Sequence, residues 1–395
     1  MASEIDLHPT ASSVLPSSVL PSAVLPSAVL PSAVPTPYGN SGFWSAYGFV
    51  LLPYSVPALV VLGYLLGGIW NFLAVVVVFG LVPWLDRRSG NDRHNPPEAL
   101  IKALSEVRLF RWITFVYVPL QALILVLGAY VVTRGTMTPL ELFGFTLSMG
   151  VMTGGLGITF AHELGHKTNR LEQNLAKSLL VMVCYGHFFI EHNQGHHLNV
   201  STRKDPASSR LGESFYRFLP RTLIGSFLGA WRLEVRRLER SHRALWGVRN
   251  QMLWFVALPV LIAALLGGLF GWQAVPFFFA QSFIAFTLLE LVNYLEHYGL
   301  ERRELEPGKY ERVNPLHSWN SNRRLTNGFL IMLQRHSDHH ANPMRRYQTL
   351  RHFAESPQLP SGYAAMVLLA LVPPLWFRIM NPRVLAFREK LASQG

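Results

Sequence analysis

Six long apolar stretches alternate with polar segments along the chain. They cover residues 43–66, 69–85, 112–133, 139–161, 253–270 and 273–295. Each is close to the ~20 residues that an α-helix needs to cross the hydrocarbon core of a bilayer. Only Gly67 and Gly68 separate the first two stretches, and a short turn around Gly271 separates the last two, so both pairs are predicted to form tight helical hairpins. The pattern predicts an all-α integral membrane protein with six transmembrane helices.

Composition and charge support this class and give the chain an orientation. Of the 395 residues, 50% are hydrophobic and only 15% are charged, which is unusual for a soluble protein. Segments 86–108, 162–252 and 296–395 hold 5, 14 and 14 of the 35 Lys and Arg residues. By the positive-inside rule, these segments and both termini are expected on the cytoplasmic side. The net charge of +12 follows from this topology, so no nucleic-acid partner is expected.

The amino-terminal region differs from the rest of the chain. Residues 13–35 repeat a five-residue unit of the form SVLPS or AVLPS, which is uncharged and rich in proline. We expect residues 1–40 to be a disordered Pro-rich tail and residues 41–395 to form a single transmembrane domain. Cys184 is the only cysteine, which excludes an internal disulfide or a Cys-rich metal site within this chain.

Histidines gather in four short windows on the predicted cytoplasmic side. The windows HELGH, EHNQGHH, NYLEHYG and RHSDHH contain nine of the fifteen histidines: His162, His166, His192, His196, His197, His297, His336, His339 and His340. The pairs 162/166, 192/196 and 336/340 have the i, i+4 separation that places two side chains on one helix face, so each pair can hold one ion. His197 and His339 would serve a second metal close to the first. The sequence therefore predicts a two-metal centre in a cytoplasmic helical region.

The ligand type limits which metal is expected. Neutral imidazole suits Zn, Cu, Fe and Ni, whereas structural zinc usually takes cysteine ligands. An all-histidine site for two metals favours iron that activates dioxygen. HELGH also matches the HExxH signature of zinc proteases, but such a protease would not use seven further clustered histidines. A membrane metal carrier is the alternative from another class, although its ligands should lie near the bilayer midplane.

Polar side chains near the histidines are candidates for supporting them. Metal-bound histidines usually donate their second ring N–H to a carboxylate, a carbonyl group or water. Four candidates are carboxylates adjacent in sequence to a proposed ligand: Glu163, Glu191, Glu296 and Asp338. Two more are polar residues inside the last apolar stretch, Glu290 and Asn293. The remaining histidines are interpreted as structural residues: His8, His94, His187, His242, His317 and His352. Of these, His187 and His317 lie closest to the windows and could also support a ligand.

The four windows resemble those of the membrane alkane 1-monooxygenases, also called alkane ω-hydroxylases. The resemblance rests on HELGHK, YGHFFIEHNQGHH, NYLEHYGL and LQRHSDHHANPMRRYQTLR, together with NPPE at 95–98, and it covers roughly residues 40–380. Membrane fatty-acid desaturases and the xylene monooxygenase hydroxylase component are wider relatives of this family. The HxxxHH form of the second window and the lone histidine of NYLEHYG favour the alkane group over desaturases.

The resemblance implies both an activity and partners. Two iron ions held by the nine histidines would use O2 to hydroxylate the terminal methyl group of medium- to long-chain alkanes to primary alcohols. Electrons would come from rubredoxin and an NADH-dependent rubredoxin reductase, neither of which is part of this chain. The location implied is the inner membrane of a bacterial cell, in contact with membrane lipid. In the family a bulky residue on the second spanning helix limits alkane length, and Val78 holds the matching position here.

Overall fold

The computed structural model describes residues 47–393, so the predicted Pro-rich tail at 1–40 lies outside the described residues. Helices account for almost all regular structure, as predicted. Strands β1 (Glu304–Glu306) and β2 (Lys309–Tyr310) form one antiparallel hairpin, in which Glu304 pairs with Tyr310. The all-α fold class is therefore confirmed for the described part of the chain.

All six predicted spanning helices are present. The candidate spans are Gly48–Leu66 (η1 Gly48–Tyr54 and α2 Ser55–Leu66), Gly68–Ser89 (η2 Gly68–Phe72, α3 Leu73–Val76, η3 Val77–Leu81 and α4 Val82–Ser89), Arg108–Val132 (α6), Pro139–Gly165 (α7 Pro139–Val151, η4 Met152–Ile158 and α8 Thr159–Gly165), Gln251–Phe270 (α13) and Ala274–His297 (α14). Gly67 and Gly68 (φ 69° and 56°) make the first tight turn, and Gly271 (φ 127°) begins the second. These positive φ values suit glycine, which has no Cβ to clash.

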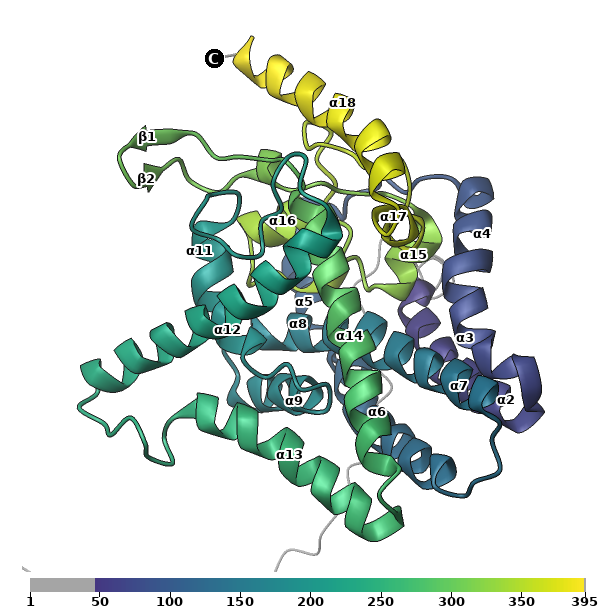
Figure 1. The fold of residues 1–395 in the computed structure, drawn as a ribbon. Helices are drawn as coiled ribbons and strands as arrows, with labels where there is room; N and C mark the ends of the chain where they lie inside the picture. The colour runs from purple at the N-terminus through teal and green to yellow at the C-terminus, as the bar shows by residue number, and fades with distance from the viewer. Residues whose placement is uncertain (1–46, 394–395) are drawn as a thin grey trace, which may run out of the picture. The chain divides into compact units, whose positions relative to one another are not determined.

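The remaining helices lie between or after the spans. They are α5 (Glu98–Glu106), α9 (Arg170–Val181), α10 (Phe188–Glu191), η5 (His192–His196), α11 (His197–Asn199), α12 (Phe215–Arg240), η6 (Pro315–His317), α15 (Arg324–Phe329), α16 (His336–Ala341), η7 (Tyr347–Thr349), α17 (Tyr363–Ala370) and α18 (Pro373–Ala392). Figure 1 shows α11 and α16 near the end of α14, and α18 beyond α17. We call this end of the spans the histidine side.

Close packing of the fourth and sixth spans brings their histidine-bearing ends together. A Cβ added to Gly154 in η4 would lie 2.5 Å from the Cα of Ala285 in α14. Small residues at such contacts let membrane helices approach closely. Because α8 ends at Gly165 and α14 ends at His297, the close contact places His162 and His297 at neighbouring helix ends.

Two buried charged residues hold the short helices of the histidine side in place. Asp86, near the end of the second span, accepts hydrogen bonds from the backbone N–H groups of Leu325 (2.8 Å) and Thr326 (3.2 Å), at the start of α15. Arg335, immediately before α16, donates to the carbonyl groups of Leu350 (2.6 Å) and His94 (2.9 Å). These bonds satisfy backbone groups that a buried, irregular segment would otherwise leave unpaired.

A buried aromatic cluster attaches the last helices to the end of the sixth span. Tyr294 and Tyr298 of α14 pack against Trp376 of α18, with ring centroids 5.1 and 5.2 Å apart. Tyr363 of α17 and Trp319 belong to the same buried cluster. The region after the sixth span is therefore packed onto it as a second layer over the histidine side.

Candidate metal centre

The structure brings all nine clustered histidines together in two neighbouring groups. One group has five members and the other has four: His162, His166, His192, His197 and His339; and His196, His297, His336 and His340. Within each group one ring nitrogen per residue lies within 4.8 Å of all the others. The rings of His197 and His340, one from each group, have centroids 4.4 Å apart. Each group could therefore hold one ion, and the two ions would be neighbours.

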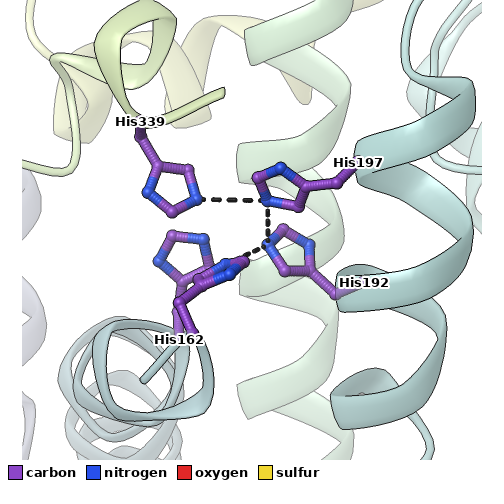
Figure 2. A group of neighbouring side chains, drawn as sticks. His162, His192, His197 and His339 are labelled. Atoms are coloured by element: carbon purple, nitrogen blue, oxygen red, sulfur yellow. Dashed lines mark hydrogen bonds between the residues drawn. The ribbon is translucent and has the colours of Figure 1, made fainter. Parts of the chain in front are cut away.

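Four separate parts of the chain supply these rings. His162 and His166 lie at the end of α8, His297 is the last residue of α14, and the others come from the η5–α11 segment and from α16. In Figure 2, the rings of His162, His192, His197 and His339 converge on one region from three different segments. A site assembled in this way depends on the packing of the whole histidine side.

A π-helix places the histidines of the second window, EHNQGHH, in different groups. Residues His192–His196 form the π-helix η5, in which the backbone repeat is i, i+5 instead of i, i+4. His192 therefore faces the same way as His197, and their Nε2 atoms are 3.1 Å apart, while His196 turns into the other group. The structure therefore separates the 192/196 pair between the two groups, contrary to the prediction that it could share one ion, whereas 162/166 and 336/340 each stay within one group.

The distances between ring nitrogens fit common metal ligands. The Nε2 atoms of His166 and His192 are 3.1 Å apart, and those of His336 and His340 are 2.9 Å apart. Two nitrogens bound at ~2.1 Å to one ion, at roughly a right angle, lie about 3 Å apart. The Nε2 atoms of His162, His196 and His297 are buried and have no hydrogen-bond partner among the described residues. Such atoms would be costly to bury unless an ion bound them.

Burial keeps the rings in the protonation state that a metal needs. Burial lowers the pKa of His192, His197 and His340 well below the ordinary value of histidine, and the neighbouring rings lower each pKa further. The rings are therefore neutral near pH 7, and neutral imidazole is the form that binds Zn, Cu, Fe or Ni. The donor set fits iron.

Asp205 supports a histidine and was missed by the sequence analysis. Its Oδ2 lies 2.8 Å from Nδ1 of His196 and also accepts a hydrogen bond from Ser208 Oγ (2.6 Å). Burial alone would raise the pKa of Asp205, but His196 and Ser208 hold it below its ordinary value. The carboxylate fixes the His196 ring with Nε2 free for an ion. The only sequence signal was the DPASS segment that follows the second window.

The polar candidates from the sequence have different partners. Glu296 contacts Nε2 of His336 at 3.2 Å. Its partner is therefore a histidine of another window and not the adjacent His297. Glu163 pairs with Lys167 (3.0 Å), and Asp338 accepts hydrogen bonds from Asn342 (2.8 Å) and the backbone N–H of Arg351 (2.8 Å). These two carboxylates hold the segments on either side of the ligands.

The other three candidates form a buried polar cluster behind the second window. Glu290 accepts hydrogen bonds from Tyr185 (2.6 Å), Thr222 (2.8 Å) and Asn293 (3.2 Å). Burial raises the pKa of Glu191 well above its ordinary value, and the neighbouring Asp205 and Glu290 raise it further. The cluster ties the sixth span to α12 and to the segment before α10.

Two of the histidines interpreted as structural also lie near the centre. The carbonyl oxygen of His317 is 3.3 Å from Nδ1 of His297, so the backbone of His317 supports the ring of a candidate ligand. The His187 ring packs against Tyr185 (4.4 Å between centroids) and Phe227 (5.5 Å). His187 is thus a packing residue.

The burial of His187 gives a pH-dependent prediction. Burial lowers its pKa from 6.5 to about 4, so the unfolded chain takes up a proton below pH 6.5 while the folded chain does not until about pH 4. Stability is therefore lost as the pH falls from 6.5, by about 2 kcal/mol at pH 5 for this residue. His187→Phe keeps a ring at this position but cannot take up a proton. We expect its thermal unfolding midpoint to fall less between pH 7 and pH 5 than that of the wild type. The midpoint of His242→Phe, a substitution at an exposed position, should fall as much as that of the wild type. Equal pH dependence in all three would contradict this.

An apolar cavity reaches the histidines. Its lining includes His162, His192 and His336, and also Val78 and Phe79 of the second span. Further walls come from the fourth and sixth spans, α15 and α17. The cavity thus connects membrane-embedded apolar side chains directly to the candidate metal centre, and Val78 borders it.

Comparison with known proteins agrees with this geometry. The sequence pattern of the fatty acid desaturase family matches residues 138–370, which include all nine histidines. The chain is 48% identical over 320 residues to alkane 1-monooxygenase 2 of Pseudomonas aeruginosa, covering 80% of this chain and 85% of that protein. The chain belongs to the alkane 1-monooxygenase family. This family membership makes the chain a monooxygenase, within the oxidoreductases, and the resemblance found in the sequence is confirmed.

Two further relatives differ in how similar they are to this chain. Alkane 1-monooxygenase 2 of Alcanivorax borkumensis is 43% identical over 353 residues, which cover 89% of this chain and 92% of that protein. The xylene/toluene monooxygenase hydroxylase component of Pseudomonas putida is more distant, at 29% identity over 258 residues, covering 65% of this chain and 68% of that protein.

Proposed function

We propose that this chain hydroxylates the terminal methyl group of medium- to long-chain alkanes to primary alcohols, using O2 and two bound iron ions. The observation that carries the proposal is the apolar cavity that reaches His162, His192 and His336. An alkane has no polar group for a protein to bind, so burial in such a cavity is the recognition available to it. The names of the relatives, alkane 1-monooxygenases at 43–48% identity, support the same substrate class.

The two histidine groups would each hold one iron. The group of five contains His162 and His192, and the group of four contains His336, so the cavity meets both groups. When bound, the irons would supply the activation of dioxygen, with two electrons from outside the chain. The protein would fix the rings through contacts such as Asp205–His196 and exclude water with the apolar cavity walls. Terminal selectivity would follow from geometry, because a chain entering a narrow cavity presents its end to the centre.

Electron delivery is proposed to come from rubredoxin, reduced by an NADH-dependent rubredoxin reductase. The segments 162–252 and 296–395, which carry the histidines after the fourth and sixth spans, hold 14 Lys and Arg residues each. Such a surface would attract an acidic donor and speed its encounter in a salt-dependent way. The same charge distribution supports a cytoplasmic location of the histidine side in the inner membrane of a bacterial cell.

Val78→Trp is expected to shorten the range of alkanes that the enzyme accepts. Val78 lines the cavity, and an indole ring would fill part of the space that a long chain needs. Product analysis by gas chromatography with alkanes of increasing length should show the longest substrates lost first. Val76→Trp is the matched control, because Val76 lies on the same span but is 60% exposed and does not line the cavity. An unchanged product range in Val78→Trp would refute the placement.

The proposed function is tested by metal analysis together with product analysis. The protein, purified in detergent, would be assayed for iron and zinc and supplied with an alkane, O2, rubredoxin, its reductase and NADH. About two irons per chain, with 1-alkanol formed only when both O2 and electrons are supplied, is the expected result. Zinc in place of iron would contradict the metal assignment. Oxidation of a xylene or an acyl lipid but of no alkane would contradict the substrate.

A further inference from the structure

A second cavity lies away from the metal centre, as a groove between α9 and α13. The two helices lie side by side (Figure 1). The groove encloses about 440 Å³ and is lined by Lys177, Ser178, Val181, Met182, Gln251, Trp254, Phe255, Leu258 and Ile262. This size is within the range of small-molecule sites. None of these residues lines the cavity that reaches the histidines.

The length of the groove along α13, from its polar end to its apolar end, is close to the depth of one membrane leaflet. Gln251 begins α13 on the histidine side, and Ile262 lies eleven residues later, about 16 Å along the helix axis. That length is about half of a ~30 Å hydrocarbon core. On the other wall, the carbonyl group of Met182 accepts a hydrogen bond from Gln281 of α14 (3.0 Å), which lies about 24 Å before His297 along the sixth span. The α13 wall therefore runs from the membrane surface to about its midplane, and the α9 wall also reaches the membrane interior.

A lysine stands at the surface end of the groove. Nζ of Lys177 donates to Oε1 of Gln251 (2.8 Å) and lies 4.4 Å from the centroid of the Phe189 ring. Among the described residues, no carboxylate oxygen lies within ion-pair distance of this Nζ. The nearby Glu234 is bound by Arg237 at 2.7 Å and by the backbone N–H of Gln251 at 2.7 Å. No carboxylate therefore pairs directly with Lys177, and its ammonium group has donors beyond the one used by Gln251.

The loop before α13 has the features of a membrane interface. Trp246 and Val248 are 76% and 79% exposed, and Trp254 donates from Nε1 to the carbonyl group of Val248 (2.7 Å). Tryptophan is enriched at the level of lipid headgroups. Arg243 and Arg249 of the same loop are exposed, so the surface around the groove is positively charged. Basic residues beside a membrane favour anionic lipids.

We propose that this groove binds one anionic phospholipid, with its phosphate at Lys177 and one acyl chain along Val181, Leu258 and Ile262. An apolar groove of one-leaflet depth fits an acyl chain, and a lysine at its surface end fits a phosphate. The lipid would fill the space between the fifth span and α9, and α9 directly follows the first histidine window. The site is independent of the catalytic proposal, since it needs neither metal nor alkane.

The test uses native mass spectrometry of the full chain in detergent, mixed with phosphatidylglycerol and phosphatidylcholine that have the same acyl chains. The wild type should retain one phosphatidylglycerol in preference to phosphatidylcholine. Lys177→Gln should weaken retention of phosphatidylglycerol about fivefold, the effect of one lysine near a membrane surface. Lys177→Arg should retain it, and Lys102→Gln, an exposed lysine of α5, should bind as the wild type does.

A second variant addresses the acyl chain. Leu258→Trp, which fills the groove and keeps the charge, should reduce the retention of both lipids. Unfolding midpoints in detergent alone show whether each variant is folded before lipid is added. Equal retention of the two lipids by the wild type, unchanged retention by Lys177→Gln, or unchanged retention by Leu258→Trp would each overturn the proposal. Displacement of the lipid by an equimolar alkane would assign the groove to substrate instead.

Discussion

Replacing His297 by alanine is expected to remove one metal ion and all hydroxylation while leaving the protein folded. His297 is one of the four candidate ligands in its group, and its buried Nε2 has no hydrogen-bond partner among the described residues. The group of five does not include it, so that group should keep its iron. Iron content should fall from about two to about one per chain, and no 1-alkanol should be detected by gas chromatography.

The control for this result is His94→Ala. His94 is an exposed histidine outside the four windows, so its removal should leave iron content and activity unchanged. Circular dichroism and the unfolding midpoint would show whether His297→Ala is folded. Two irons per chain in folded His297→Ala would remove His297 from the ligand set.

Replacing Asp205 by alanine is expected to lower iron affinity or activity 10- to 100-fold, although Asp205 is not itself a proposed ligand. Its Oδ2 contacts Nδ1 of His196 at 2.8 Å, and outer partners of metal-bound histidines usually have effects of this size. Without the carboxylate the His196 ring is free to rotate or change tautomer. Iron affinity would be measured by competition with a chelator, alongside turnover with a saturating alkane.

Two further variants separate positioning from general stability. Asp205→Asn keeps an oxygen that can accept from His196 Nδ1–H, so it should recover part of the loss. Glu172→Gln changes another buried carboxylate, which pairs with Arg111 (3.3 Å) and Arg346 (3.0 Å) away from the histidines. It should lower the unfolding midpoint without changing iron affinity. If Glu172→Gln lost iron as strongly as Asp205→Ala, the effect would be structural.

The spans and the ligand windows could be predicted from the sequence because both are local patterns. Apolar length alone locates a spanning helix, and the predicted bounds agree with the observed ones to within a few residues. Histidines are unusual enough in clusters to identify the windows. Their division into two groups could not be predicted, because HNQGH is compatible with an α-helix and only the packed structure shows it as the π-helix η5.

The supporting residues were harder to predict because they are neighbours in space and not in sequence. On a helix, the residue after a ligand is turned about 100° away from it. Asp338, which is adjacent to His339 in α16, accordingly faces Asn342 and Arg351, and Glu296 reaches His336 instead of the adjacent His297. Asp205 is brought back to His196 by the turns between them, and no periodic pattern marks such a contact.

The order in which the ligands occur along the chain has a consequence for biogenesis. Both histidine groups include residues of α16, which follows the sixth span: His339 in the group of five, and His336 and His340 in the group of four. Neither of the two proposed ions could be fully coordinated until all six spans have been synthesised and inserted with their histidine-bearing ends on one side of the bilayer. Metal capture would then depend on the correct insertion of every span, so metal content would report on insertion.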